Sequence, residues 1–224
     1  MIKLRTIALL AGALCLAGAA ADLWLLPRAV PHPDQPLKHE PTKVLPDEDK
    51  LEALLGRLGP SVPAETRTKV ADALMSEARR NGYDPFFLLA LVGVESNYRI
   101  TASSARGARG LLQLKPSTFA WMAAREPEVG AHELETGDDP ATDVRLAVRY
   151  FHYLEHRFQS RTAALMAYNS GPRRVALALR DGELTDRMKQ YPARVRKEYE
   201  RVIRLAEGKR MQLDEGLVLL ARAP

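Results

Sequence analysis

The 224-residue sequence predicts a predominantly α-helical protein. Apolar residues recur at three- and four-residue spacing through most of the chain after Pro46, which is the period of an amphipathic helix. Proline, aspartate and glycine stand at the ends of these segments, where they are typical of helix starts and stops. No stretch shows sustained alternation of apolar and polar residues rich in β-branched side chains, as half-buried strands would. We therefore expect a helical domain with at most a minimal β-hairpin near residues 101–112.

The N-terminal residues have the composition of an export signal. Lys3 and Arg5 precede an uncharged apolar run, residues 7–21, which ends in the small residues AGAAA; this pattern predicts a cleavable signal peptide over residues 1–21. The alternative is a membrane anchor, because the apolar run continues beyond Asp22 to nearly the length that spans a bilayer. We favour cleavage because Asp22 is costly inside hydrocarbon. The only cysteine, Cys15, lies in this segment, so the cleaved product could form no disulfide.

A linker is expected to follow. Six prolines lie among polar residues from Pro27 to Pro46, which indicates an extended linker over residues 22–46. The helical pattern then covers residues 47–207, which we expect to form one domain. Residues 208–224 form a C-terminal tail that either packs on the domain as a short helix or contacts a partner.

The first three helices have clear boundary signals. One begins with the acids around Asp47 and ends at Gly59, and a second runs from Pro63 to Arg80 and stops at Gly82. The third opens at Asp84, a good N-cap residue that is followed by a proline in the first turn.

The later helices begin after a short loop. Residues 101–110 are small and contain glycine, so a loop or short hairpin fits them better than a helix. The remaining expected helices are Pro116–Arg125, Pro140–His156, Arg161–Tyr168, Pro172–Arg180 and Pro192–Glu207.

The charge of the chain is weakly positive overall and strongly positive in one region. Without residues 1–21, which hold two basic and no acidic residues, the formal net charge falls from +5 to +3, too little to suggest a nucleic-acid partner. From Arg157 to Arg204, however, there are 12 Lys and Arg against 5 Asp and Glu. This excess is either a solvated helical face or a surface that attracts a polyanionic polymer.

The stretch ALVGVESNYR contains the first candidate for chemistry, Glu95. If the helix continues through it, Glu95 shares one stripe with Leu88, Leu91 and Tyr98, so we expect it on the buried side. Burial disfavours the charged carboxylate and raises its pKa, which keeps a carboxylic acid protonated and able to donate a proton.

Two further stretches carry polar residues that could face a ligand. Gln113 stands 18 positions after Glu95 in GARGLLQL, where glycines permit close backbone approach and an amide can bond sugar hydroxyls. Tyr168 and Asn169 stand in AYNSGP at the end of an apolar helical run. Taken singly, the first is equally a turn before core residues, and the second a helix stop.

Together, the segments ESNY, GARGLLQL and ALMAYNSGPRRV resemble, in this order and spacing, the catalytic domain of the soluble-lytic-transglycosylase (SLT) family. The flanking helices YDPFFLLALVGVES and DDPATDVRLAVRYFHYL are similar as well, and the resemblance covers about Val62 to Leu205. It implies a lysozyme-like fold and cleavage of bacterial peptidoglycan, and hence a protein of the periplasm or cell envelope.

The resemblance also implies roles for individual residues. Glu95 corresponds to the catalytic acid and base of the family. Tyr199 is a weaker correspondence, because Val195 and Arg196 replace the acid and threonine that often precede it. The residues expected to contact substrate are Ser96, Gln113, Tyr168, Asn169 and Tyr199.

The implied reaction is a non-hydrolytic cleavage of the MurNAc-β-1,4-GlcNAc bond that leaves a 1,6-anhydroMurNAc end. Ordinary glycoside hydrolysis uses two carboxylates, whereas the matched motifs supply only Glu95; Asp138 and Asp139 precede a proline and are expected to cap a helix. No cofactor is implied, and the five histidines suggest no metal site. Two alternatives remain open: a goose-type-lysozyme-like muramidase that admits water, and a non-catalytic peptidoglycan-binding protein of an envelope-spanning assembly. A membrane tether and a protein partner are also left open.

Overall fold

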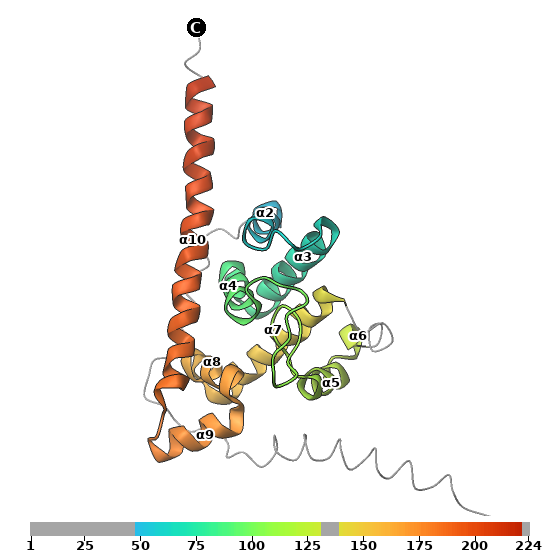
Figure 1. Cartoon of the computed structure of the whole chain (residues 1–224), viewed down its shortest axis with the longest axis vertical. Helices are drawn as coiled ribbons and strands as arrows, with labels where there is room; N and C mark the ends of the chain where they lie inside the picture. The colour runs from blue at the N-terminus through green and yellow to red at the C-terminus, as the bar shows by residue number, and fades with distance from the viewer. Residues whose placement is uncertain (1–47, 131–138, 221–224) are drawn as a thin grey trace, which may run out of the picture. The chain divides into compact units, whose positions relative to one another are not determined.

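The computed structural model describes residues 48–130 and 139–220, with side chains up to residue 208. The described residues are mostly helical (Figure 1), which confirms the predicted fold class. The expected signal peptide and linker, residues 1–46, lie outside the described residues, as does Asp138. None of the described helices combines the length and hydrophobicity that crossing a membrane requires.

The helices follow one another with short connections. In chain order they are α2 (Glu48–Leu58), α3 (Ala64–Asn81), α4 (Pro85–Ser96), α5 (Pro116–Arg125), α6 (Pro127–Gly130), α7 (Pro140–Phe158), α8 (Arg161–Ser170), α9 (Pro172–Asp181) and α10 (Asp186–Leu220). The chain divides into two compact units. In the described part, the larger unit comprises residues 48–152 and 192–220, and the smaller unit comprises residues 153–191.

Most helix boundaries agree with the predictions, because the capping residues act as expected. The carboxylate of Asp84 accepts a hydrogen bond from the backbone N–H of Phe86 at 2.8 Å and caps α4. The segment Pro116–Arg125 forms α5 as predicted, and α3 ends one residue later than predicted, with Gly82 as its left-handed C-cap.

The short helix α6 was not predicted, and α7 and α8 each end two residues later than predicted, at Phe158 and Ser170. Two further differences concern α4 and α10. Helix α4 ends at Ser96, because Asn97 and Tyr98 adopt left-handed φ angles of 53° and 61°; Tyr98 therefore does not continue the stripe of Glu95. Helix α10 begins at Asp186 instead of Pro192 and runs to Leu220, through part of the expected tail. A proline inside a helix removes a backbone donor and crowds the preceding turn, but α10 continues through Pro192. The helix starts earlier because Thr185 accepts the N–H of Met188.

The core of the larger unit is built around α4. Every residue of α4 from Pro85 to Val92 is buried, and α2 and α3 both pack against this helix. Beside it, the rings of Tyr83, Phe87 and Phe151 lie 5.8–6.1 Å apart in tilted contacts. These contacts leave α4 covered along most of its length and free to meet solvent only near its C-terminal end.

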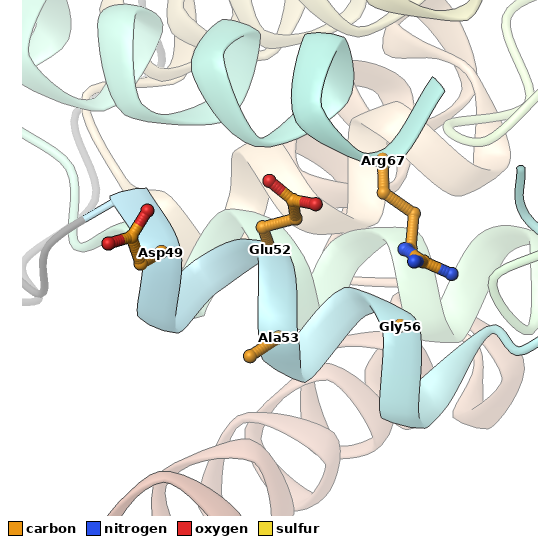
Figure 2. A pocket seen from close by; sticks show the side chains of 5 residues that line it. All are labelled: Asp49, Glu52, Ala53, Gly56 and Arg67. Atoms are coloured by element: carbon orange, nitrogen blue, oxygen red, sulfur yellow. The ribbon is translucent and has the colours of Figure 1, made fainter. Parts of the chain in front are cut away.

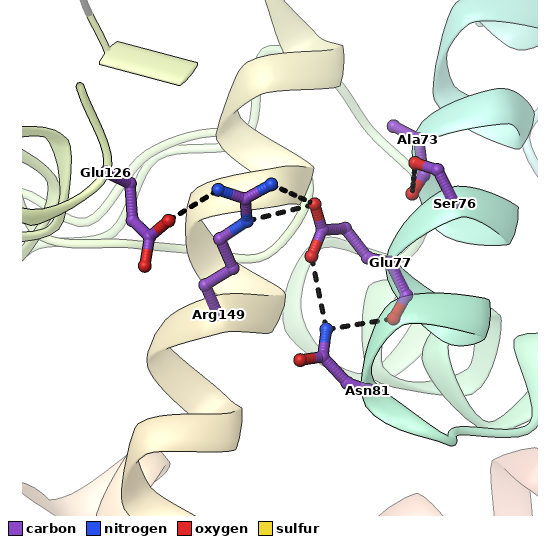
Figure 3. Close-up of polar contacts among 6 residues, drawn as sticks. All are labelled: Ala73, Ser76, Glu77, Asn81, Glu126 and Arg149. Atoms are coloured by element: carbon purple, nitrogen blue, oxygen red, sulfur yellow. Dashed lines mark hydrogen bonds and ion pairs between the residues drawn. The ribbon is translucent and has the colours of Figure 1, made fainter. Parts of the chain in front are cut away.

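A buried ion network ties three parts of the larger unit together (Figure 3). Arg149 of α7 donates to Glu77 of α3 at 2.8 Å and to Glu126, the residue after α5, at 2.6 Å. Asn81 donates to the second oxygen of Glu77 at 3.1 Å. The side chains of Arg149 and Glu77 are 9% and 3% exposed, so each charge depends on the other for compensation.

The smaller unit contains the predicted helix stop at AYNSGP. Helix α8 starts at its N-cap Ser160, whose hydroxyl oxygen accepts from the N–H of Ala163, and it ends at Ser170. Gly171, with φ 92°, separates it from α9, which begins at Pro172 and packs against α8.

Replacing Arg149 by alanine should lower the free energy of unfolding by about 3–5 kcal/mol, because it leaves the buried Glu77 carboxylate without a cation. Urea denaturation followed by circular dichroism measures this loss. The matched control is Arg79→Ala, since Arg79 pairs with Glu48 at 3.2 Å but its side chain is 55% exposed, and exposed pairs contribute less than about 1 kcal/mol. Equal losses in the two variants would show that the network does not depend on burial.

Candidate active site

A pocket of about 520 Å³ lies in the larger unit where the C-terminal end of α4 meets α10. From α4 and the turn after it, the lining residues are Gly93, Val94, Glu95, Ser96, Asn97 and Arg99. From α10 they are Arg194, Lys197, Glu198, Arg201 and Arg204. Two of the predicted site residues, Glu95 and Ser96, therefore share this pocket.

Glu95 is half-buried, not fully buried as expected from its place beside Leu88 and Leu91. The helix emerges from the core in its last turn, because α4 ends one residue after Glu95. The carboxyl group thus has protein on one side and the pocket on the other. Complete burial therefore cannot be the reason for a protonated Glu95 carboxyl group. That the group carries a proton before the reaction is part of the proposed function below.

One wall of the pocket is held by a hydrogen bond between distant parts of the chain. The hydroxyl of Tyr98 donates to Oε1 of Glu198 at 2.6 Å. Burial, and after it the hydrogen bond to the Glu198 carboxylate, raises the pKa of the Tyr98 phenol, so the phenol keeps the proton that it donates. This bond fixes α10 against the turn that follows α4.

Further contacts fix α10 to α4. The guanidinium of Arg194 donates to the carbonyl oxygen of Val94 at 3.1 Å. The hydroxyl of Tyr199 donates to Oδ2 of Asp84 at 2.6 Å, and its ring meets Phe87 edge to face. The end of α4 next to Glu95 and the N-cap at its start are therefore both bonded to α10.

Close packing explains why the apolar helix α4 contains a glycine, Gly93. A Cβ atom built at this position would lie 2.5 Å from the hydroxyl oxygen of Tyr98 and 2.8 Å from Oε1 of Glu198. Only a residue without a side chain lets this hydrogen-bonded pair pass over the helix.

The pocket is lined by more cations than anions. Glu95 and Glu198 are its two carboxylates, and the cations are Arg99, Arg194, Lys197, Arg201 and Arg204. The sequence did not identify these five as site residues. For the four cations of α10 the available signal was the basic excess between residues 157 and 204, but the sequence does not show which members of that region line the pocket; Arg99 lies outside it.

Ser96 and Gln113 are engaged in the fold itself. Ser96 is 3% exposed, and its hydroxyl donates to the carbonyl of Val92 at 3.0 Å. The amide of Gln113, a residue with φ 51°, donates to the carbonyls of Ala102 and Gly110, both at 2.9 Å. Gln113 thus closes the loop after α4, and its contact with substrate remains a prediction.

That loop is the small hairpin expected near residues 101–112. It has two isolated antiparallel bridges, Ser103 with Arg109 and Arg109 with Leu114. Gly110 turns the chain with φ 75°, and a Cβ there would clash with the carboxylate of Asp143. Gly110 and the Gln113 amide together give the loop its shape.

The remaining predicted site residues do not line the pocket. Tyr199 belongs to the larger unit, where its hydroxyl serves the Asp84 cap. Tyr168 is half-buried and Asn169 exposed at the end of α8, in the smaller unit. Their approach to Glu95 therefore stays a prediction.

A second pocket, of about 450 Å³, lies between α2 and α3. Figure 2 shows Arg67 reaching from α3 toward Gly56, with Asp49, Glu52 and Ala53 along α2. Arg67 donates to the carbonyl of Val62 at 3.2 Å, so part of its donor capacity is used locally. This pocket contains none of the predicted site residues. Among the described residues, no group of three or more His, Cys, Asp or Glu side chains could hold a metal ion.

Comparisons with known proteins identify the family to which the chain is similar. The family model of the transglycosylase SLT domain matches residues 72–190, more than half of the chain. Among solved structures, the chain is similar to an inactive glutamate-to-glutamine mutant of the lytic transglycosylase Slt from Pseudomonas aeruginosa. The identity is 26%, the TM-score is 0.51, and the similarity covers 57% of this chain and 23% of that one. The chain thus corresponds to less than a quarter of that protein.

Replacing Gly93 by alanine should destabilise the protein by about 1–3 kcal/mol, because the added methyl group overpacks the Tyr98–Glu198 pair. Differential scanning calorimetry measures the effect. Gly56→Ala is the matched control, since Gly56 is also inside a helix but a Cβ there would meet only the flexible side chain of Arg67 at 3.2 Å. Helix propensity favours alanine by about 1 kcal/mol at both sites. A stabilised Gly93→Ala variant would contradict the close packing at this position.

Replacing Gln113 by glutamate should open the loop, because a carboxylate cannot donate to the two carbonyls that the amide bonds. We expect a loss of about 1–3 kcal/mol in local stability, measured by hydrogen exchange at the N–H groups of Arg109 and Gly110. Gln159→Glu is the control: Gln159 has the same φ of 51°, but it is exposed and donates to one carbonyl only. Unchanged exchange in Gln113→Glu would show that the amide does not hold the loop.

Proposed function

Because the chain belongs to the transglycosylase SLT domain family, we propose that it is a lytic transglycosylase that cleaves the glycan strands of peptidoglycan in the pocket of Glu95. The observation that carries the proposal is the position of Glu95. It is a half-buried acid in the last turn of a buried helix, and it opens into a pocket that the rest of the lining makes polar. The Pseudomonas aeruginosa relative is inactive after a glutamate-to-glutamine exchange, which is consistent with a chemistry that depends on one glutamate.

We assign the acid and base steps to the same residue. Protonated Glu95 gives its proton to the oxygen that joins MurNAc to GlcNAc, while the MurNAc acetamido group stabilises the positive charge that develops at C1. The Glu95 carboxylate then removes the proton of the MurNAc 6-hydroxyl, whose oxygen attacks C1. The product is a 1,6-anhydroMurNAc end, and no water is consumed. A nucleophile already tethered in the same sugar has a large advantage in orientation.

The surroundings of the second carboxylate favour this single-acid scheme over two-carboxylate hydrolysis. Glu198 is the other acid of the pocket, and its Oε1 accepts both the Tyr98 hydroxyl at 2.6 Å and the Arg201 guanidinium at 2.7 Å. A carboxylate held by two donors serves the fold, and it is poorly placed to activate a water molecule.

We propose that Tyr168 and Asn169 contact the sugar or orient the Glu95 carboxyl, as the family resemblance implies. Ser96, Gln113 and Tyr199 act chiefly by shaping the ends of α4 and the following loop, which their hydrogen bonds support.

The substrate sets the place of action. Peptidoglycan lies outside the cytoplasm, so we propose that residues 1–21 direct export to the periplasm or cell envelope. Anchoring through this segment and a partner in an envelope assembly are further proposals, which no contact in the described residues addresses.

Glu95→Gln should abolish cleavage while leaving the fold intact, because an amide can neither give nor retake the proton. We expect the rate to fall by at least about a hundredfold, the lower end of what general acid–base catalysis contributes. The measurement is mass spectrometry of the fragments released from purified peptidoglycan. Glu200→Gln is the matched control, since Glu200 is exposed on α10 and does not line the pocket.

The chemical ends of the released fragments distinguish a lytic transglycosylase from a muramidase and from a non-catalytic binding protein. Ends with 1,6-anhydroMurNAc, absent with Glu95→Gln, would support the proposal. The same fragments with one added water would indicate a goose-type-lysozyme-like muramidase. Binding to peptidoglycan without any fragments from the folded native chain would favour a non-catalytic wall-binding protein and overturn the enzymatic proposal.

A further inference from the structure

Helix α10 presents a row of cations to the pocket of Glu95. Arg194, Lys197, Arg201 and Arg204 are spaced by three, four and three residues, which places them on one face of the helix. All four are exposed, and all four line the pocket. We call these four residues the cationic row.

The charges of the row are only partly compensated. Arg201 pairs with Glu198 at 2.7 Å, and Arg194 donates to the carbonyl of Val94. In the part of the chain with described side chains, neither Lys197 nor Arg204 forms an ion pair. Arg196, which lies outside the row, reaches Glu200 at 4.0 Å. On an ordinary solvated helix face, cations alternate with carboxylates and pair with them, as Arg196 does with Glu200. The cationic row contains fewer such pairs.

We propose that the cationic row binds the carboxylates of the peptide stems carried by the glycan strand that enters the pocket. The inference rests on the proposed function, and it adds to it a recognition site for the peptide part of the substrate. The row and Glu95 line the same pocket, so one strand can place a sugar at Glu95 and its peptide stem at the row. A stem attached to that sugar strand is the nearest source of several carboxylates.

Length and chemistry both fit a short anionic peptide. From Arg194 to Arg204 the row extends about 15 Å along the helix, at roughly 1.5 Å per residue. An extended peptide of four or five residues covers about the same distance, at roughly 3.3 Å per residue. Three of the four cations are arginines, whose planar forks bind carboxylates by two parallel hydrogen bonds.

The test measures binding without cleavage. In the full chain made inactive by Glu95→Gln, we compare affinity for soluble glycan strands that carry peptide stems and for strands from which an amidase has removed them. The test variant adds Lys197→Gln and Arg204→Gln. The control variant adds Lys69→Gln and Arg196→Gln instead, which removes the same two charge types from exposed positions outside the pocket.

We expect the test variant to bind stem-bearing strands roughly tenfold more weakly than the control, as the loss of two exposed charge contacts predicts, with little change for stem-free strands. Equal binding by test and control variants would overturn the inference and leave the proposed function standing. An equal loss of affinity for strands with and without stems would also overturn the inference, since the row would then not recognise the peptide stems. If the Glu95→Gln chain with the native row bound neither strand, the proposed function itself would fail.

A membrane surface is the competing anionic ligand. Vesicles of phosphatidylglycerol serve as its probe, with the same test and control variants. If the test variant lost vesicle binding but kept its affinity for stem-bearing strands, the row would belong to a lipid surface, and the inference would be wrong.

Discussion

The hydrogen bond between Tyr98 and Glu198 is the interaction on which the candidate site depends. It joins residues 100 positions apart and passes over Gly93, where any side chain would collide with it. Because it holds α10 against the end of α4, the pocket acquires its second wall. Without that wall, Glu95 would stand on an open helix end. The bond also engages Glu198, the other carboxylate of the pocket.

The position of Glu95 follows from how α4 leaves the core. The helix is buried from Pro85 to Val92, and two residues with left-handed φ turn the chain immediately after Ser96. An acid in the last turn of such a helix is held rigidly by packing yet remains in contact with the pocket. This arrangement suits a group that must meet substrate in one orientation, because orientation accounts for much of the rate of an intramolecular reaction.

In the proposed mechanism, the acid and the cations that bind substrate come from different parts of the chain. The acid is supplied by α4, near the middle of the sequence, whereas most of the pocket's positive charge is supplied by α10, about a hundred residues later. The loop between α4 and α5 is shaped by Gln113 and Gly110. Arg194 and Tyr199 of α10 are bonded to Val94 and Asp84, so α10 supports both ends of the helix that carries Glu95.

The sequence by itself determined the helical class and most helix boundaries, and it singled out Glu95 as the candidate acid. Helix caps such as Asp84 and helix stops such as residues 169–172 act through neighbours within one or two turns. The helix ends that they cause can therefore be predicted from the local sequence. The tertiary structure alone decided that Tyr98 bonds Glu198, that Tyr199 bonds Asp84, and which cations of α10 line the pocket. These outcomes depend on contacts between residues 100 or more positions apart, and neither periodicity nor capping signals carry information about such contacts.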